Sequence, residues 1–217
     1  MNDDERALLA KISSIVRFKK GDVIYGEGDP AEAAFNIVGG VVTAYRTFGD
    51  GEIVTAFVFQ GDLFGLSEEG RYTNSAKAAT AVVAYKIPLS ALRRILDQHA
   101  DLDVDLIIKL CEELRQSQRH ALLLARKRAT TRLAMFIEML ERLQTARGEP
   151  ASEVHLPMGR SSMAAYLGLT PAALSRAFHR LTSSKIVAAR DRRHLKIVDR
   201  VAFQKLADTR STGGSAV

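Results

Sequence analysis

The chain has 217 residues, of which 47% are hydrophobic and 26% charged, and its net charge is +6. This length holds one large domain or two small ones, and a single cysteine, Cys111, excludes an internal disulfide framework. No apolar run approaches the roughly 18 residues of a membrane span, and the first residues are acidic where a secretory signal is basic. We therefore expect a cytoplasmic protein with no membrane partner, disordered only at residues 209–217.

Charge is divided unevenly along the chain. Residues 1–118 carry 13 Lys and Arg against 18 Asp and Glu, whereas residues 119–217 carry 18 against 7. A basic surface without a macromolecular ligand is the plainer interpretation. An excess this large in the shorter part favours nucleic acid, because a polyphosphate that binds clustered Lys and Arg releases its condensed counterions.

Glycine separates the first part into short segments. Ten of the 15 glycines lie within residues 21–70, and none lies within residues 71–147. Runs of β-branched and aromatic residues predict strands at residues 15–18, 22–25, 35–46, 52–59 and 77–87. Phe48, Gly49, Asp50 and Gly51 predict a hairpin, because Gly and Asp tolerate positive φ. We expect residues 1–97 to form an antiparallel all-β domain.

Residues 98–127 change to a helical period, and the helix is expected to begin near Asp101. Its narrow apolar stripe repeats at steps of three and four: Ile107, Leu110, Leu114, Ser117, Ala121 and Leu124. Such a stripe packs either on its own domain or on a second copy, and its charged flanks favour a homodimer seam. Cys111 lies beside the stripe, where we expect a buried structural thiol.

A domain boundary is predicted at residue 128, after three consecutive cations at residues 126–128. Either Thr130 or Thr131 is expected to cap the next helix, which ends before Gly148. Residues 128–217 form the predicted DNA-binding domain.

Residues 159–182 predict a helix-turn-helix. Ser161 or Ser162 opens a short helix, Gly168 breaks it, and Thr170 and Pro171 supply the N-cap and first position of a second helix. An ordinary pair of packed helices is the alternative. The second helix presents Ala172, Ala173, Ser175, Arg176, His179 and Arg180 outward, a face small enough for a major groove.

Two short strands are predicted after this helix, at residues 185–187 and 194–198, joined by a basic turn at residues 190–193. The turn is either an exposed hairpin or a wing whose cations contact phosphates. We expect Arg176 to pair with guanine, Ser175 to bond a base or phosphate, and Arg180 to contact the backbone. The predicted DNA-binding residues are Arg160, Ser161, Thr170, Ala172, Ser175, Arg176, His179, Arg180, Arg192 and Arg193.

This order of parts resembles the family of the cyclic-AMP receptor protein and the fumarate and nitrate reduction regulator. The motifs that carry the resemblance are residues 18–25 (FKKGDVIY), 39–42 (GGVV), 61–65 (GDLFG) and 174–176 (LSR). It covers nearly the whole chain and implies an α+β fold: an N-terminal double-stranded β-helix (β-roll), a long dimerisation helix and a C-terminal winged helix-turn-helix. It further implies a homodimer on palindromic double-stranded DNA, with RNA polymerase as a partner.

The chain departs from the family pattern at the effector site. Members that bind cyclic nucleotides follow the glycine of the third motif with Glu and later present Arg-Ser-Ala, whereas here Leu66 follows Gly65 and Asn74 precedes Ser75. These four residues therefore form a degenerate effector pocket, in which a cyclic phosphate lacks its paired cation.

Other cofactors of the family also lack their ligands. Residues 1–30 contain no cysteine for an iron-sulfur centre, and the five histidines are scattered. The resemblance is therefore to FixK-like members that need no effector, cofactor or metal. The alternative is a ligand- or haem-gated sensor of the same fold.

The recognition helix also departs from the family pattern, because members commonly carry Glu-x-x-Ser-Arg and this chain has Ala172 in place of the Glu.

Enzyme motifs are missing: there is no P-loop, H-E-x-x-H or nucleophile elbow, and residues 61–66 lack G-x-G-x-x-G spacing. We expect a transcriptional regulator without catalytic residues.

Overall fold

The computed structural model describes residues 3–49, 51–67, 69–149 and 152–207. The predicted disordered tail and Asp50 at the hairpin tip lie outside these residues. The chain divides into two compact units, Met1–Gln118 and Arg119–Val217, called the N-terminal and C-terminal units below. Each is described by itself.

The N-terminal unit contains antiparallel sheets in which the pairing follows a β-roll. Within the described residues, the strand orders are β1-β8-β3-β6 and β2-β7-β4-β5. The predicted hairpin is confirmed, because Phe48 pairs with Gly51 at the end of the β4–β5 register. The strands are β1 (Ser14–Phe18), β2 (Val23–Tyr25), β3 (Ala33–Gly39), β4 (Val42–Phe48), β5 (Gly51–Val58), β6 (Leu63–Phe64), β7 (Ser75–Ala78) and β8 (Val82–Pro88).

Two predicted strands are each split in the structure. Residues 35–46 form parts of β3 and β4, and residues 77–87 form parts of β7 and β8. The first break is at Gly40, whose φ is +92° and where a Cβ would collide with the carbonyl oxygen of Ala81. Only glycine fits this backbone approach, so the chain changes sheet at a point where the apolar pattern continues.

The interior between the sheets is filled by aromatic rings. Tyr25 stacks on Tyr72 with ring centroids 3.7 Å apart, and Phe35 stacks on Phe64 at 5.3 Å. Phe18 meets Phe35 edge to face. Each fully buried ring of this kind stabilises the fold by about 1.5–3 kcal/mol, so this cluster is a main source of the unit's stability.

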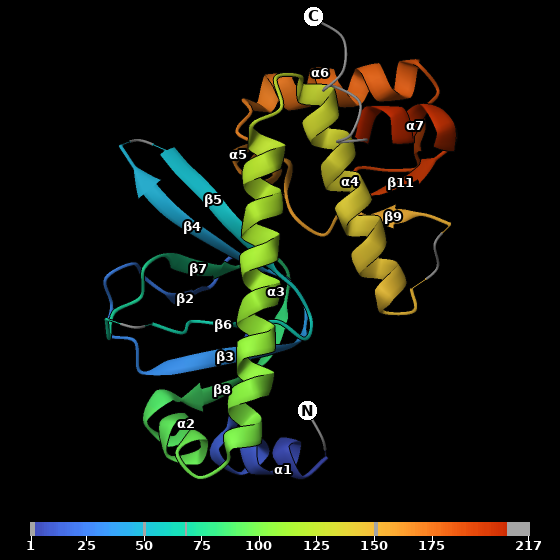
Figure 1. Ribbon diagram of the computed structural model, residues 1–217. Coiled ribbons are helices and arrows are strands. Elements are labelled where there is room, and N and C mark those ends of the chain that lie inside the picture. The colour runs from blue at the N-terminus through green and yellow to red at the C-terminus, as the bar shows by residue number, and fades with distance from the viewer. Residues whose placement is uncertain (1–2, 50, 68, 150–151, 208–217) are drawn as a thin grey trace, which may run out of the picture. The chain divides into compact units, whose positions relative to one another are not determined.

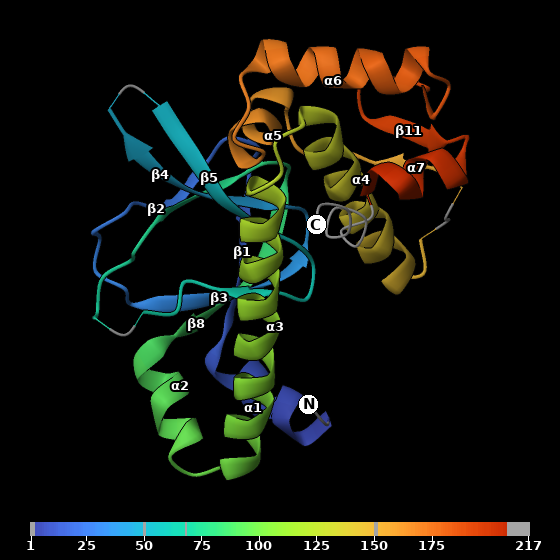
Figure 2. The same ribbon diagram turned by 45° about the horizontal axis from the view of Figure 1, so that its top comes forward.

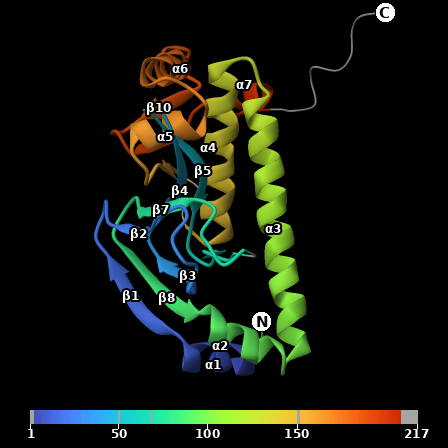
Figure 3. The same cartoon turned by 90° about the vertical axis from the view of Figure 1, so that its left-hand side faces the viewer.

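Helices flank the β-roll. α1 (Asp3–Ile12) is absent from the predicted elements, α2 (Leu89–Leu96) follows β8, and α3 (Ala100–Leu124) begins where the helical period predicts it. Figures 1 and 3 show α1 and α2 close to the beginning of α3. The apolar stripe of α3 is exposed in the single chain, and Cys111, predicted to be buried, is exposed with it.

The C-terminal unit packs helices against a small sheet. Its elements are α4 (Ala129–Ala146), β9 (Val154–His155), α5 (Arg160–Tyr166), α6 (Pro171–Ser183), β10 (Val187–Ala189), β11 (His194–Ile197) and α7 (Arg200–Ala207). Phe136, Met163 and Phe203 are fully buried in its core. The predicted threonine cap of α4 is wrong: Arg128, in extended conformation, precedes the helix, and Thr130 and Thr131 lie inside it.

Candidate nucleic-acid interface

The helix-turn-helix is built from α5 and α6, and Figure 2 shows α5 against the beginning of α6. Gly168 has φ +59° and forms the turn. The predicted cap is confirmed, since the Ala173 N–H donates to Thr170 Oγ1 over 3.1 Å and Pro171 takes the first helical position. α5 begins at Arg160, before the predicted opening residue Ser161 or Ser162, so both serines lie within the helix.

Arg132 of α4 holds this turn in place. Its Nη1 donates to the carbonyls of Leu167 and Gly168 over 2.9 and 3.0 Å, and its Nε donates to the Arg126 carbonyl over 2.7 Å. Charge-assisted bonds to carbonyls at the end of a helix are among the stronger hydrogen bonds in proteins. The sequence analysis missed this residue, because its partners are not its neighbours along the chain.

The recognition helix α6 separates a buried face from an exposed one. Leu174, Ala177 and Leu181 are buried, while Phe178 is only partly buried. On the other side, Ala172, Ser175, Arg176, His179 and Arg180 are exposed, together with Ser161 on α5. The His179 ring also lies 3.3 Å from Ser183 Oγ. The structure thus brings most of the predicted base-contacting residues onto one face.

Arg160 differs from the other predicted contacts because its guanidinium is partly buried. It lies over the Phe178 ring, 3.6 Å from the centroid, and Nη2 donates to the Arg192 carbonyl over 3.3 Å. Nη1 is buried with no hydrogen-bond partner among the described residues. Burial first, and the charge of Arg192 second, lower the pKa of Arg160. Arg160 therefore links α5 to the recognition helix and to the wing.

The wing is formed by β10 and β11, with β9 completing an antiparallel sheet. The first wing strand begins at Val187 and not at Lys185 as predicted, because Lys185 takes a left-handed conformation with φ +54°. Asp191 accepts hydrogen bonds from the backbone N–H groups of Arg193 and His194 over 2.6 and 2.9 Å. These bonds lower the pKa of Asp191 and shape the turn, while Arg192 and Arg193 remain exposed.

Ion pairing divides the arginines of this unit into two groups. Arg190 bonds Glu153 over 2.7 Å, Arg142 bonds Glu138 over 2.9 Å, and Arg200 bonds Glu141 over 2.7 Å. Arg176, Arg180, Arg192 and Arg193 lie within 4.0 Å of no carboxylate among the described residues, and the same holds for Arg119, Arg128, Arg132 and Arg160. The first four are exposed and belong to the recognition helix or the wing turn.

The degenerate effector pocket lies in the N-terminal unit. Gly65 has φ +83°, and a Cβ there would lie 3.4 Å from the Tyr25 ring. Ser75 Oγ accepts the Glu27 N–H over 2.9 Å. Neither Leu66 nor Asn74 is a cation, and three nearby cations have protein partners: Arg46 bonds Glu27, Lys77 bonds Glu52, and Arg71 bonds the Gly28 carbonyl. These residues do not fit an anionic cyclic nucleotide.

The described residues hold no cluster of three His, Cys, Asp or Glu side chains that suits a metal ion. His120 contacts Tyr166 in two ways. The two rings stack with their centroids 3.9 Å apart, and His120 Nε2 lies 2.7 Å from the Tyr166 carbonyl oxygen. Among the helices described, none is long and apolar enough to cross a membrane.

Comparison with protein families gives two matches. Residues 15–99 match the cyclic nucleotide-binding domain, and residues 131–206 match the Crp-like helix-turn-helix domain. The transcriptional activator protein anr of Pseudomonas aeruginosa is 30% identical over 192 residues, which cover 87% of this chain and 78% of that protein. The nitrogen fixation regulation protein FixK of Azorhizobium caulinodans is 30% identical over 201 residues, which cover 92% of this chain and 81% of that protein.

A solved structure extends the likeness to three dimensions. FixK2 from Bradyrhizobium japonicum aligns with a TM-score of 0.83 at 29% identity, covering 94% of this chain and 100% of that one. The expected α+β fold, with a β-roll, a long helix and a C-terminal helix-turn-helix, is confirmed.

Proposed function

Because the chain belongs to the CRP/FNR family of transcription regulators, with that family's helix-turn-helix DNA-binding domain, we propose that it binds a palindromic DNA site as a homodimer. In this proposal α6 enters the major groove in each half-site. The half-site centres lie about one helical turn, roughly 34–36 Å, apart.

One observation supports this proposal more than any other: the recognition helix and the wing turn present four exposed arginines, Arg176, Arg180, Arg192 and Arg193, that lie within 4.0 Å of no described carboxylate. An arginine with an intramolecular carboxylate partner has already neutralised its charge, whereas these four are available to phosphates and bases. Arg176 is exposed on α6 with Ser175 beside it, where a bidentate guanidinium can reach guanine O6 and N7, and the exposed Arg192 and Arg193 of the wing turn suit the phosphate backbone.

The homodimer proposal comes from α3. Ile107 and Leu114 are 57% and 59% exposed, and the other stripe residues Leu110, Ser117, Ala121 and Leu124 are also exposed. A helix packed only on its own domain would bury such a stripe. A second α3 packed along it buries the apolar side chains of both copies.

The remaining assignments are part of the proposal. The protein needs no cyclic nucleotide, cofactor or metal, acts in the cytoplasm together with RNA polymerase, and catalyses no reaction. The effector assignment rests on Leu66, Asn74 and the stacked Tyr25 and Tyr72. Calorimetry is expected to show no millimolar or tighter binding of cyclic AMP. Saturable binding that changes DNA affinity contradicts it.

Selection of bound sites from a random DNA pool tests the DNA proposal directly. We expect a palindrome with a guanine in each half-site, and an affinity that falls steeply with salt. A nearly flat dependence of the binding constant on salt, or enrichment of no sequence, contradicts it.

A further inference from the structure

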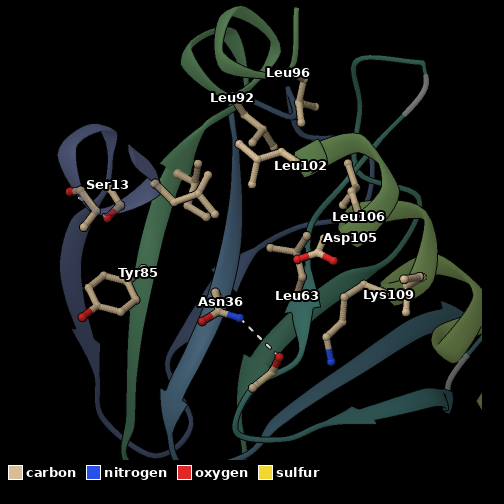
Figure 4. A pocket seen from close by; sticks show the side chains of 15 residues that line it. Ser13, Asn36, Leu63, Tyr85, Leu92, Leu96, Leu102, Asp105, Leu106 and Lys109 are labelled. Carbon is tan, nitrogen blue, oxygen red and sulfur yellow. Dashed lines mark hydrogen bonds between the residues drawn. The ribbon is translucent and has the colours of Figure 1, made fainter. Parts of the chain in front are cut away.

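A cavity of about 690 Å³ lies in the N-terminal unit, outside the β-roll interior. It is bounded by α1, α2, the beginning of α3, and strands β3, β6 and β8, and Figure 4 shows side chains from these elements pointing into it. Its volume falls within the roughly 300–1,000 Å³ typical of small-molecule sites.

This cavity is separate from the degenerate effector pocket. Asn36 and Leu63 line it, whereas their chain neighbours Phe35 and Phe64 belong to the aromatic cluster. Successive residues of a strand point to opposite faces, so the cavity and the cluster lie on opposite sides of one sheet. None of the four residues of the effector pocket lines it.

The wall is mostly apolar and includes Leu92 and Leu102, which are buried, and Leu106, which is partly buried. Five polar side chains also line it (Figure 4): Ser13, Asn36, Tyr85, Asp105 and Lys109. Lys109 lies at the edge of the cavity, because its side chain is 47% exposed and its ammonium group pairs with Glu112. Asn36 is fixed because its Nδ2 donates to the Asp62 carbonyl over 3.2 Å. A ligand that suits this lining has a hydrocarbon chain, which packs against the apolar wall, and one polar head group, which lies beside Lys109.

The charges around Lys109 determine whether the ligand's head group is anionic, cationic or neutral. Lys109 Nζ already donates to Glu112 Oε2 over 2.9 Å, and Asp105 also lines the cavity. The lining holds one acid and one cation, Asp105 and Lys109, and Glu112 already neutralises Lys109. An anionic head therefore finds no unpaired cation, and a cationic head meets Lys109 itself.

We propose that this cavity binds an uncharged, largely hydrocarbon small molecule whose single oxygen acceptor takes a hydrogen bond from Lys109. An ammonium group has three N–H donors, so Lys109 keeps its bond to Glu112 while donating to the ligand. A neutral head also needs no charged partner at the edge of the cavity, where Lys109 is already paired with Glu112. This inference is independent of DNA binding, because every lining residue belongs to the N-terminal unit.

Calorimetric titration of the full-length protein with three probes tests the ligand class. The probes 1-octanol, octanoate and octylamine share one hydrocarbon chain and differ in head-group charge at neutral pH. We expect saturable binding of octanol at least about tenfold tighter than binding of the other two. Tighter binding of octanoate or octylamine overturns the ligand class, and binding of none overturns the site.

Variants locate the binding. Leu106→Trp fills the cavity and is expected to abolish octanol binding, while Val38→Trp, on the same strand as Asn36 but outside the cavity, leaves it unchanged. Leu96→Trp from α2 is the second filling variant, in case the first is unfolded by circular dichroism. Undiminished octanol binding in a folded filling variant overturns the location.

Lys109→Met keeps the hydrocarbon stem and removes the donor. We expect octanol affinity to fall roughly fivefold, the effect of one net hydrogen bond. Unchanged affinity contradicts the role of Lys109. Leu114→Asp is expected to disrupt the α3 stripe and with it the proposed dimer. If octanol binds only this variant, the partner copy fills the cavity in the dimer, and the proposal is overturned.

Discussion

The two units use their basic residues differently. In the N-terminal unit, Arg46 and Lys77 bond Glu27 and Glu52. In the C-terminal unit, Arg176, Arg180, Arg192 and Arg193 lie within 4.0 Å of no described carboxylate, although Arg142, Arg190 and Arg200 of the same unit are paired. Arg93 and Arg94 of the N-terminal unit also lack a described carboxylate partner, so pairing alone does not mark the interface. Position and pairing together do, because exposed, unpaired cations on the recognition helix and wing turn release counterions when they bind phosphates, whereas a cation paired within its own chain gains less.

The largest expected effect comes from breaking the proposed dimer. Leu114→Asp places a charge in the seam, where it has no partner once two copies of α3 pack together. We expect monomers by sedimentation velocity and loss of roughly 10³-fold or more in affinity for the palindrome. Ile53→Asp, at a similarly exposed position on β5, is the control and is expected to remain dimeric. A dimeric Leu114→Asp protein moves the interface away from this stripe.

Next in size is the loss of the proposed guanine contact. Arg176→Ala removes the exposed guanidinium at the centre of α6 without disturbing Leu174 or Ala177 beneath it. Discrimination at the guanine position is expected to fall by about 1–3 kcal/mol, measured by binding to sites with each base substituted. Equal losses on all sequences would instead make Arg176 a backbone contact.

A gain of sequence preference is expected from Ala172→Glu. Ala172 is exposed at the beginning of α6, where family members commonly carry Glu. A carboxylate accepts a hydrogen bond from cytosine N4, whereas the alanine methyl packs on a thymine methyl, so the variant is expected to shift preference toward cytosine by about 1–3 kcal/mol. Site selection on both proteins measures this. If the selected base is unchanged, position 172 does not face the groove.

The salt dependence of binding distinguishes paired from unpaired arginines more directly. Arg192→Ala removes an unpaired cation of the wing turn and is expected to flatten the slope of log affinity against log salt by about one unit. Arg142→Ala removes a cation that Glu138 already neutralises, and we expect an unchanged slope. Equal slopes for the two variants contradict the comparison between paired and unpaired cations.

Local signals made much of the interface predictable. Gly168, Thr170 and Pro171 act within a few residues of their own positions, so the turn and the cap of α6 follow from sequence. The same reasoning failed for the threonine cap of α4, because Arg128 already supplies the extended residue before the helix. Lys185 was predicted to begin a strand because apolar residues follow it. Its positive φ instead places it in the turn between α6 and β10.

Features that depend on distant partners were not predictable. Arg132 bonds carbonyls about 35 positions away, and Arg160 lies over Phe178, so neither role leaves a local pattern. The break at Gly40 depends on the close approach of Ala81. Cys111 lies beside an apolar stripe and was predicted to be buried, but it is exposed, because no other described element of the chain covers this part of α3. Sequence patterns report neighbours along the chain, and tertiary contacts decide the rest.

The smallest expected effect is at Arg46, and it completes the comparison between the units. Arg46→Met keeps the apolar stem but removes the ion pair with Glu27. The side chain of Arg46 is 47% exposed and that of Glu27 is 33% exposed. Solvent screens such a pair, so the variant is expected to lose less than about 1 kcal/mol of unfolding free energy, measured by urea denaturation. Because Arg46 is paired and lies outside the DNA-binding domain, both the affinity for the palindrome and its salt slope are expected to match wild type. A flatter slope in Arg46→Met would place DNA on the N-terminal unit and would contradict the assignment of the interface to α6 and the wing turn.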